Sequence, residues 1–341
     1  MSTLFRFFKG SFLFSAAGLI AAWMLGGPKA AFIAAILSVL EVSLSFDNAV
    51  VNATVLKDMD EVWRKRFITW GMLIAVFGMR VVFPVLIVAV IAHLNPWDAL
   101  MLAVGKPDQY AATLTSAHVL VAGFGGAFLM MVFLKFFLDR EKDVHWIAVI
   151  EKPLTKIGRV QAAEIAVCLT AVYLISTWLG AHERIEFILA AIAGVVAYIV
   201  VDGFAALLET EEPGDAGMVA RTGLSAFLYL EVLDASFSFD GVIGAFALSN
   251  NIFIIAIGLG IGAMFVRSLT IMFVEKGTLE QFRYLEHGAF YAIGALATIM
   301  FVGTFHEISE VVTGLIGAGF IGLALVSSIH HNRKAAAAAV A

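Results

Sequence analysis

Long apolar runs, separated by short polar segments, recur along the whole chain. Most runs hold about 20 residues or more, the length that an α-helix needs to cross the hydrocarbon core of a bilayer. The pattern predicts ten membrane-spanning helices, at residues 10–27, 30–56, 67–94, 117–138, 161–180, 185–208, 218–248, 251–274, 285–305 and 307–330. The segments between them are too short for a separate catalytic domain. We therefore expect an all-α polytopic membrane protein, with one integral membrane domain over residues 1–341.

The lysines and arginines fall mainly on one side of the membrane in this arrangement. Sixteen of the 22 lie in segments on the side of the N-terminus, whereas the other side has only Lys29, Lys106 and Arg184. Cytoplasmic segments of membrane proteins carry the excess of positive charge. We expect a multi-pass protein of the inner (plasma) membrane with both termini in the cytoplasm.

Composition excludes several classes of protein. Hydrophobic residues make up 61% of the 341 residues and charged residues only 14%, against about 25% charged residues in soluble domains. The net charge of -5 offers no basic surface for nucleic acid. The single cysteine, Cys168, excludes intrachain disulfides and thiolate metal clusters. The run at 10–27 lacks an A-x-A-like cleavage site, so we expect it to be retained rather than removed as a signal peptide.

Two short acidic segments indicate an internal repeat. The sequence Glu-Val-Ser-Leu-Ser-Phe-Asp-Asn at 41–48 recurs, 193 positions later, as Asp-Ala-Ser-Phe-Ser-Phe-Asp-Gly at 234–241. In each half the next span contains an arginine, Arg80 or Arg267, and the span after that has a histidine near its start. The order of these features is therefore the same in both halves.

The two motif helices are the second and the seventh spans, so an odd number of helices separates their positions and they run in opposite directions. We expect two inverted five-helix repeats, at 10–180 and 185–330. This architecture is typical of secondary transporters, whose substrate site lies near the midplane between the halves.

The motifs place acidic side chains near the middle of two spans. Glu41 and Asp234 lie close to the centres of their helices, where a carboxylate costs several kcal/mol and normally faces a bundle interior or an aqueous path. Inversion of the repeats sets Glu41 beside Asp234. It also sets Asp47 and Asp240 about 9 Å away from them along the helix axis, on opposite sides.

One face of the first motif helix is polar. Its members follow each other at i, i+4, i+7 and i+11 and are Glu41, Ser45, Asn48 and Asn52. Asp47 points about 120° away from Glu41 on an ideal helix. Asp47 and Ser43 join this face only if the helix breaks near residues 45–48, and Gly241 and Gly244 would ease a similar break in the second half.

Four carboxylates with serine and asparagine oxygens, and no thiolates, are typical of a site for a hard divalent cation such as Mn²⁺, Mg²⁺ or Ca²⁺. The candidate metal ligands are Glu41, Asp47, Asn48, Asp234 and Asp240, and the candidate supporting residues are Ser43, Ser45, Ser236, Ser238, Asn52, Arg80 and Arg267. A simpler interpretation is that the acids only form buried ion pairs with the two arginines. Four acids and a polar face favour a site in which each arginine holds one carboxylate.

Catalytic motifs are missing from the sequence. It contains no G-x-x-x-x-G-K-[ST], no H-E-x-x-H and no G-x-S-x-G. We expect no enzymatic activity and no cofactor, with the divalent cation as the substrate.

The motifs L-E-V-S-L-S-F-D-N-A-V-V (Leu40–Val51) and L-E-V-L-D-A-S-F-S-F-D-G-V-I-G-A-F-A (Leu230–Ala247) resemble the TerC-type integral membrane family. That family belongs to the LysE-like exporter superfamily, and the chain looks closest to a bacterial branch carried as a domain of unknown function. The resemblance covers about 30–140 and 218–330. It implies that the acidic residues line a metal path and that the substrate is Mn²⁺, exported from the cytoplasm.

Matching of the motifs carries the family's site onto Asp47, Asn48, Asp234 and Asp240. The chain departs from many TerC relatives at three neighbouring positions, Phe46, Phe239 and Gly241. A bulkier neighbour changes the size of a cavity, so these departures leave the identity of the cation open.

Three functions remain to be separated. The first is secondary transport of a divalent cation, most simply Mn²⁺. The second is export of a small organic solute such as an amino acid, which needs a roomier and partly apolar pocket. The third is a non-transporting membrane scaffold linked to stress (tellurite) resistance, which needs a large partner surface but no charges at the midplane. The expected partners are the lipid bilayer and a divalent metal ion, and not nucleic acid.

Overall fold

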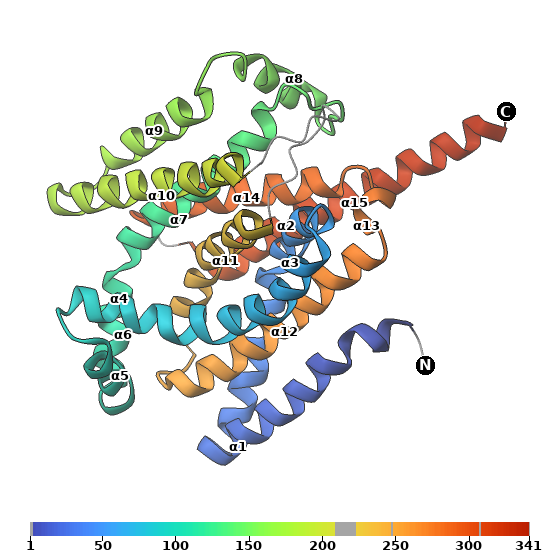
Figure 1. Cartoon of the computed structure of the whole chain (residues 1–341). Coiled ribbons are helices and arrows are strands. Elements are labelled where there is room, and N and C mark those ends of the chain that lie inside the picture. Colours follow the sequence, from blue (N-terminus) through green and yellow to red (C-terminus); the bar gives the residue numbers. More distant parts are fainter. Residues whose placement is uncertain (1–2, 209–222, 247, 307, 341) are drawn as a thin grey trace.

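The computed structural model describes residues 3–208, 223–246, 248–306 and 308–340, and every regular element within these ranges is a helix (Figure 1). The elements are α1 (Thr3–Leu44), α2 (Phe46–Lys57), α3 (Glu61–Arg66), η1 (Phe67–Gly71), η2 (Ile74–Val82), α4 (Phe83–Ile91), α5 (Pro96–Gly105), α6 (Pro107–Ser116), α7 (His118–Leu138), α8 (Ala148–Ile157), α9 (Ala163–Ser176), α10 (Ala181–Leu208), α11 (Gly223–Ala245), α12 (Ile252–Glu275), α13 (Thr278–Gln281), α14 (Leu285–Gly303) and α15 (Glu310–Val340). The all-α prediction is confirmed for this part of the chain.

Seven helices in the described ranges are long and apolar enough to cross a membrane. They are Phe5–Leu44, Ile74–Ile91, His118–Leu138, Ala181–Gly203, Ile252–Glu275, Leu285–Gly303 and Val312–Lys334. A shorter apolar helix, Ala163–Ser176, coincides with another expected span. The chain is therefore a multi-pass membrane protein, with seven candidate spans where ten are expected from the sequence.

The long helix α1 consists of two arms joined at a pair of glycines. Gly27 has a φ of 71°, in the left-handed region that glycine adopts without steric cost, and Pro28 follows it. Both arms pack against α12. In the first arm Ser11 Oγ donates a hydrogen bond of 2.8 Å to the carbonyl of Met264. This arrangement places the turn expected between the first two spans at Gly26 and Gly27.

Glycines on α12 allow the second arm of α1 to approach closely. A Cβ atom added at Gly262 would lie 2.4 Å from Glu41 Cβ and 2.9 Å from the carbonyl oxygen of Ser38, and one at Gly258 would lie 2.6 Å from Leu37 Cβ. Small residues spaced by four positions are a common device for close helix packing in membranes. The contact fixes the backbone around Glu41 against α12.

The expected break in the first motif helix is present at Ser45, which has φ −100° and ψ 18° and separates α1 from α2. The hydrogen bonds from Ser45 N to Glu41 O and from Ala49 N to Ser45 O remain, at 2.9 and 3.2 Å. The break is therefore a kink and not an unwound segment.

The second motif has no corresponding break, because α11 is continuous from Gly223 to Ala245. The expectation of a break near Gly241 and Gly244 is therefore wrong. A glycine weakens a helix by only about 1 kcal/mol. Gly241 and Gly244 alone are too small a perturbation to interrupt a helix that is packed on several sides.

The third expected span contains two π-helical segments. η1 and η2 lie between α3 and α4, and the residues at their junctions, Met72, Leu73 and Phe83, have α-helical dihedral angles. The four segments therefore form one nearly continuous helix. Short π-helical segments within α-helices are often found at functional sites, and Arg80 lies on η2.

Helices α7 and α14 contact each other in a reciprocal way. A Cβ at Gly126 of α7 would lie 2.7 Å from the ring of Phe301 of α14, and a Cβ at Gly294 of α14 would lie 2.4 Å from the ring of Phe133 of α7. In both helices the glycine precedes the phenylalanine by seven positions. Each helix therefore offers a glycine to a phenylalanine of the other helix, so the two contacts are equivalent.

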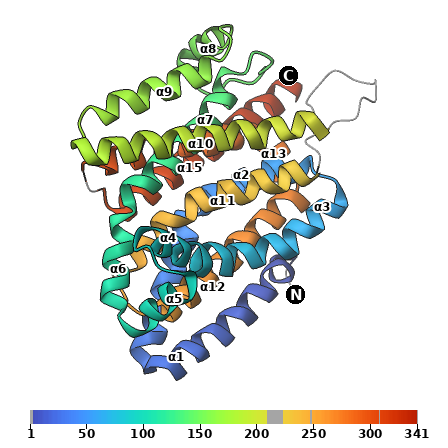
Figure 2. The same ribbon diagram turned by 60° about the vertical axis from the view of Figure 1, so that its left-hand side comes forward.

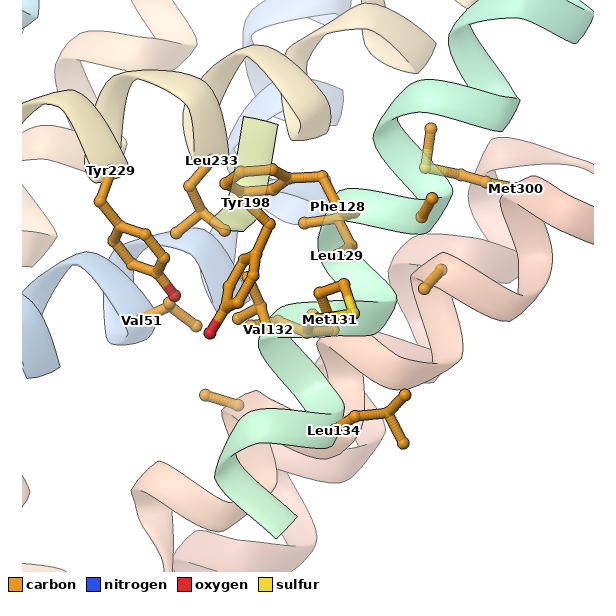
Figure 3. Close-up of a cluster of buried hydrophobic side chains, with 14 of the residues drawn as sticks. Val51, Phe128, Leu129, Met131, Val132, Leu134, Tyr198, Tyr229, Leu233 and Met300 are labelled. Carbon is orange, nitrogen blue, oxygen red and sulfur yellow. The ribbon is translucent and has the colours of Figure 1, made fainter. Parts of the chain in front are cut away.

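The main hydrophobic core surrounds α7. Phe128, Leu129 and Met131 of α7 meet residues of α2, α10, α11 and α14, and Figure 3 shows this cluster with Val51, Tyr198, Tyr229, Leu233 and Met300 around it. Helices α9 and α10 lie at the far end of the molecule from α1 (Figures 1 and 2). Helices α2, α11 and α12 lie between these ends.

Candidate cation site

A polar cavity of about 40 Å³ lies among α1, α2, η1, η2, α11 and α12. Figure 2 shows α2 and α11 side by side in this region, with α12 behind them. The residues that line the cavity are Glu41, Ser45, Asn48, Asn52, Phe67, Gly71, Met72, Ala75, Val76, Arg80, Glu231, Asp234, Ala263, Val266, Arg267 and Thr270. Charged and amide side chains are therefore gathered at one place inside an otherwise apolar bundle.

The polar face of the first motif helix points into this cavity. Its four members all line the cavity, as their spacing predicts: Glu41, Ser45, Asn48 and Asn52. Asp234 from α11 lines the same cavity. The structure thus brings Glu41 and Asp234 to the same cavity, as the expected inversion of the two halves predicts.

Glu41 forms an ion pair with Arg80. Both side chains are only 3% exposed, and Arg80 Nη2 donates to Glu41 Oε1. Arg80 Nη1 donates to the carbonyl of Ala75, five residues earlier on η2, and Ser45 Oγ donates to Glu41 Oε1 at 3.1 Å. The charge of Glu41 is therefore neutralised inside the protein, as the ion-pair interpretation expects for one arginine.

Among the described residues, the hydrogen-bond partner of Asp234 is an amide. Asn48 Nδ2 donates a hydrogen bond of 2.7 Å to Asp234 Oδ1 and joins α2 to α11. The other carboxylate oxygen, Oδ2, is buried and has no hydrogen-bond partner in the described part of the chain. One oxygen of Asp234 is therefore positioned, and the other can accept a further ligand.

Glu231 is a cavity residue that is not among the candidates expected from the sequence. Its side chain lines the cavity, is 8% exposed, and has both carboxylate oxygens buried with no described hydrogen-bond partner. Glu231 follows Leu230 and precedes Val232, so it repeats the Leu-Glu-Val triplet that contains Glu41. That triplet was the signal that could have identified it.

Arg267 does not hold a carboxylate as expected. Its Nη1 donates to the thioether sulfur of Met72 at 3.1 Å, which is a weak acceptor. Its Nε atom is buried without a partner, and no ion pair joins Arg267 to a carboxylate whose side chain the structure describes. The expectation that each arginine holds one acid is therefore confirmed for Arg80 alone.

Asp47 lies outside the cavity. Its side chain is 5% exposed and accepts a hydrogen bond of 2.9 Å from the backbone N–H of Asn48. The side chain faces α15, where a Cβ atom added at Gly317 would lie 3.3 Å from Asp47 Oδ2. The kink at Ser45 is too small to turn Asp47 onto the face of Glu41, so the prediction that it joins that face is wrong.

Of the four candidate supporting serines, Ser45 lines the cavity and the other three do not. Ser43 is exposed and donates to the carbonyl of Val39, and Ser236 donates to the carbonyl of Val232. Ser236 and Ser238 are buried but do not line the cavity. Asp240 belongs to α11, but its side chain lies outside the described residues.

Five buried oxygens of four residues converge on the cavity without a described partner: Asn48 Oδ1, Asn52 Oδ1, Glu231 Oε1, Glu231 Oε2 and Asp234 Oδ2. Buried polar atoms are almost always hydrogen-bonded, and unpaired ones call for a specific explanation such as a bound ion or water. The described residues contain no group of three or more His, Cys, Asp or Glu side chains placed to hold a metal. The oxygen set is therefore mixed, with two carboxylates and two amides in place of the expected four acids.

Another buried acid, Glu151 of α8, lies away from the cavity and has several partners. It accepts from the backbone N–H groups of Trp146 and Ile147 and lies 3.1 Å from Lys142 Nζ and 3.5 Å from His287 Nε2. Burial alone would raise the pKa of Glu151, but the Ile147 N–H and the Lys142 charge outweigh it and keep that pKa below its ordinary value. This group fixes α8 and the preceding loop against α14.

Comparisons with known proteins agree with a membrane protein. A protein family described as "Protein of unknown function (DUF475)" matches residues 46–335. The chain is 30% identical over 105 residues to "Uncharacterized membrane protein YceF" of Bacillus subtilis (strain 168), an alignment that covers 29% of this chain and 40% of that protein.

The chain thus spans well under two thirds of that relative's length, and no solved structure matches it. The family match extends over most of the chain, from α2 to α15, and includes the residues that line the cavity on α2, η2, α11 and α12. The chain therefore belongs to the family described as protein of unknown function (DUF475).

Proposed function

We propose that this protein is a secondary transporter of the TerC type that exports a divalent metal cation, with Mn²⁺ as the expected substrate, and that it acts without a cofactor or enzymatic chemistry. The observation that carries the proposal is the set of five partnerless oxygens from Asn48, Asn52, Glu231 and Asp234. They lie on α2 and α11, so both halves of the chain contribute to the same site.

The chemistry of these oxygens supports a hard cation. Carboxylate and amide oxygens suit Mg²⁺, Ca²⁺ and Mn²⁺, whereas Cu⁺ prefers sulfur. The charge also supports a divalent ion, because Glu231 and Asp234 together supply up to two negative charges while Glu41 is already neutralised by Arg80. Mg²⁺ gives up its hydration water reluctantly, which favours Mn²⁺ in a confined site.

The size of the cavity argues against the organic solute. About 40 Å³ accommodates an ion or a few waters, since one water needs about 10–15 Å³ of such space. Pockets for small organic ligands measure about 300–1,000 Å³. A scaffold, in turn, has no need of three carboxylates and two arginines around a buried cavity.

The packing supports transport by inverted repeats. The reciprocal glycine–phenylalanine contacts of α7 and α14 are those of a local two-fold axis. The first motif helix packs on α12, and η2 packs on the second motif helix α11. A site between two such halves can be exposed to either side of the membrane by rocking one half against the other. Both termini lie in the cytoplasm in this proposal.

Uptake into proteoliposomes that contain the full chain tests the proposal. We expect Mn²⁺ to accumulate faster than Mg²⁺, and lysine not to accumulate at all. Asp234→Asn, which removes a site carboxylate, is expected to abolish Mn²⁺ uptake, whereas Glu275→Gln, an exposed acid at the end of α12, is expected to retain it. Uptake of lysine, or equal Mn²⁺ uptake by wild type and Asp234→Asn, would refute this function.

A further inference from the structure

A second pocket, of about 340 Å³, lies beside the polar cavity, among the first arm of α1, the π-helical segments and α12. Its lining includes Phe14 of α1, Met264 of α12, and Trp70, Leu73 and Phe77 of the third expected span. The last three side chains are about half exposed or more. The pocket is therefore apolar and opens on the outer surface of helices that are long and apolar enough to cross a membrane.

The first arm of α1 runs antiparallel to α12. Ser11 Oγ lies 2.8 Å from Ser268 Oγ. One to two turns further along α1, a Cβ added at Gly18 would lie 3.0 Å from Ile261 Cδ1. Higher residue numbers on α1 therefore meet lower numbers on α12.

The third expected span has the same direction as this arm. Met72 contacts Arg267 through its sulfur, and Val76 Cγ1 would lie 3.2 Å from a Cβ added at Gly260. This span is thus also antiparallel to α12. The start of α1 and helix α3 accordingly lie toward the same end of the molecule (Figure 2).

Two exposed basic residues lie at this end, just before the pocket on each helix. Lys9 precedes Phe14 by five positions, and Arg66 precedes Trp70 by four, which corresponds to about 6–8 Å along a helix axis. Lys65 is engaged by Glu61 at 2.7 Å. Lys9 and Arg66 form no ion pair with an acid in the described ranges. Their positive charges are available to a ligand that occupies the pocket.

The charge and the polarity of this region match one class of ligand. An apolar pocket that opens toward lipid accepts a hydrocarbon chain, and basic residues at the membrane surface attract acidic headgroups by about 1 kcal/mol for each Lys or Arg. We propose that the pocket binds one acyl chain of an acidic phospholipid, whose headgroup lies against Lys9 and Arg66. This inference goes beyond the proposed transport and does not depend on it.

The lipid would also adjoin the polar cavity. Met72 and Val76 line both the apolar pocket and the polar cavity, and the sulfur of Met72 accepts from Arg267. An acyl chain in the pocket therefore packs against the wall that separates the cavity from the bilayer.

Native mass spectrometry of the purified full chain tests the preference for an acidic lipid. Phosphatidylglycerol, which is acidic, and phosphatidylcholine, which is zwitterionic, are added separately and without metal. We expect wild type to retain one phosphatidylglycerol with about tenfold higher affinity than phosphatidylcholine, and to unfold at a higher temperature when it is bound. Equal affinity for the two lipids would overturn the proposal.

Two pairs of variants test the location. Leu73→Trp fills the pocket and is expected to weaken phosphatidylglycerol binding at least fivefold, whereas Leu86→Trp, an exposed position of α4 outside the pocket, should bind as wild type does. Equal binding by these two variants would overturn the assignment of the chain to this pocket.

The second pair changes only exposed charges. Lys9→Gln/Arg66→Gln is expected to lose most of the preference for phosphatidylglycerol, and Lys29→Gln/Lys106→Gln, which removes two exposed lysines elsewhere, is expected to keep it. A preference that persists in the first double variant would overturn the headgroup site. Because no cation is present, these results are independent of whether the chain transports one.

Discussion

Glu41 and Glu231 each stand in a Leu-Glu-Val triplet, and both side chains line the cavity between α2 and α11. Their surroundings differ. Glu41 pairs with Arg80 and accepts from Ser45, whereas neither oxygen of Glu231 has a partner in the described ranges. The first half of the chain thus supplies an anchored charge, and the second half supplies a carboxyl group with no described partner.

The difference originates on other helices and not in the triplets themselves. Arg80 reaches Glu41 from the π-helical segment η2, where its second nitrogen bonds the carbonyl of Ala75. Its counterpart Arg267 lies on the regular helix α12 and bonds Met72. The arginine of the following span thus gives two similar motifs different surroundings, an ion pair for Glu41 and no described partner for Glu231.

The largest expected effect comes from breaking the anchored pair. Arg80→Met leaves Glu41 charged and buried without a cation, so we expect a loss of about 3–5 kcal/mol in the free energy of unfolding, measured by denaturation in detergent. Glu231→Gln breaks no ion pair or hydrogen bond among the described residues and should cost no more than about 1 kcal/mol, the centre of the distribution for point substitutions.

The double variant Arg80→Met/Glu41→Gln checks the cause of this loss. It is expected to recover much of the stability, because no unpaired charge remains. Equal destabilisation by Arg80→Met and Glu231→Gln would remove the distinction between the two glutamates.

A smaller loss in the free energy of unfolding is expected when a substitution pushes α12 away from Glu41. In Gly262→Ala the new methyl group would lie 2.4 Å from Glu41 Cβ, so the helices must separate, at a cost of about 1–3 kcal/mol for overpacking. Gly322→Ala on α15, where a Cβ meets nothing within 4 Å, is the matched control. Similar thermal unfolding of both variants would mean that the close approach does not constrain the Glu41 side of the cavity.

Glu151 extends the comparison to a buried acid with many donors outside the membrane spans. Because its folded pKa lies below the ordinary value, its stabilising effect is present above that value and is lost as pH falls through the folded pKa. We expect Glu151→Gln to cost about 1–2 kcal/mol at pH 7.

The difference in unfolding free energy between wild type and Glu151→Gln should shrink once the pH falls below about 4. Denaturation of both proteins across this pH range measures it. A difference that stays constant down to the lowest pH would contradict the assignment of the acid-sensitive stability to Glu151.

Much of the fold and part of the site follow from sequence patterns. Apolar runs of membrane length locate the long helices, because no other structure satisfies the backbone in lipid. The spacing of Glu41, Ser45, Asn48 and Asn52 predicts their shared face, since the kink at Ser45 barely alters the helical period. The ion pair between Glu41 and Arg80 could also be expected, because a buried charge without a partner is strongly unfavourable.

The rest depends on tertiary contacts that a single sequence does not specify. The shared Ser-x-Ser-Phe-Asp segments set Glu231 opposite Ser38. The two Leu-Glu-Val triplets match only when the halves are shifted by three residues. The size of the kink decided that Asp47 faces α15 and not the cavity. The short helices α5 and α6, outside every expected span, lack a long apolar run that would have marked them.

Direct binding of Mn²⁺ to the purified full chain tests the central claim, that the cavity between α2 and α11 is a cation site. Titration calorimetry on wild type, Asp234→Asn and Glu275→Gln compares a lost ligand with a distant acid. We predict saturable binding by wild type and Glu275→Gln, and at least about a tenfold weaker affinity for Asp234→Asn, which corresponds to about 1.4 kcal/mol. Binding of equal affinity in all three proteins would place any cation site elsewhere and contradict the account.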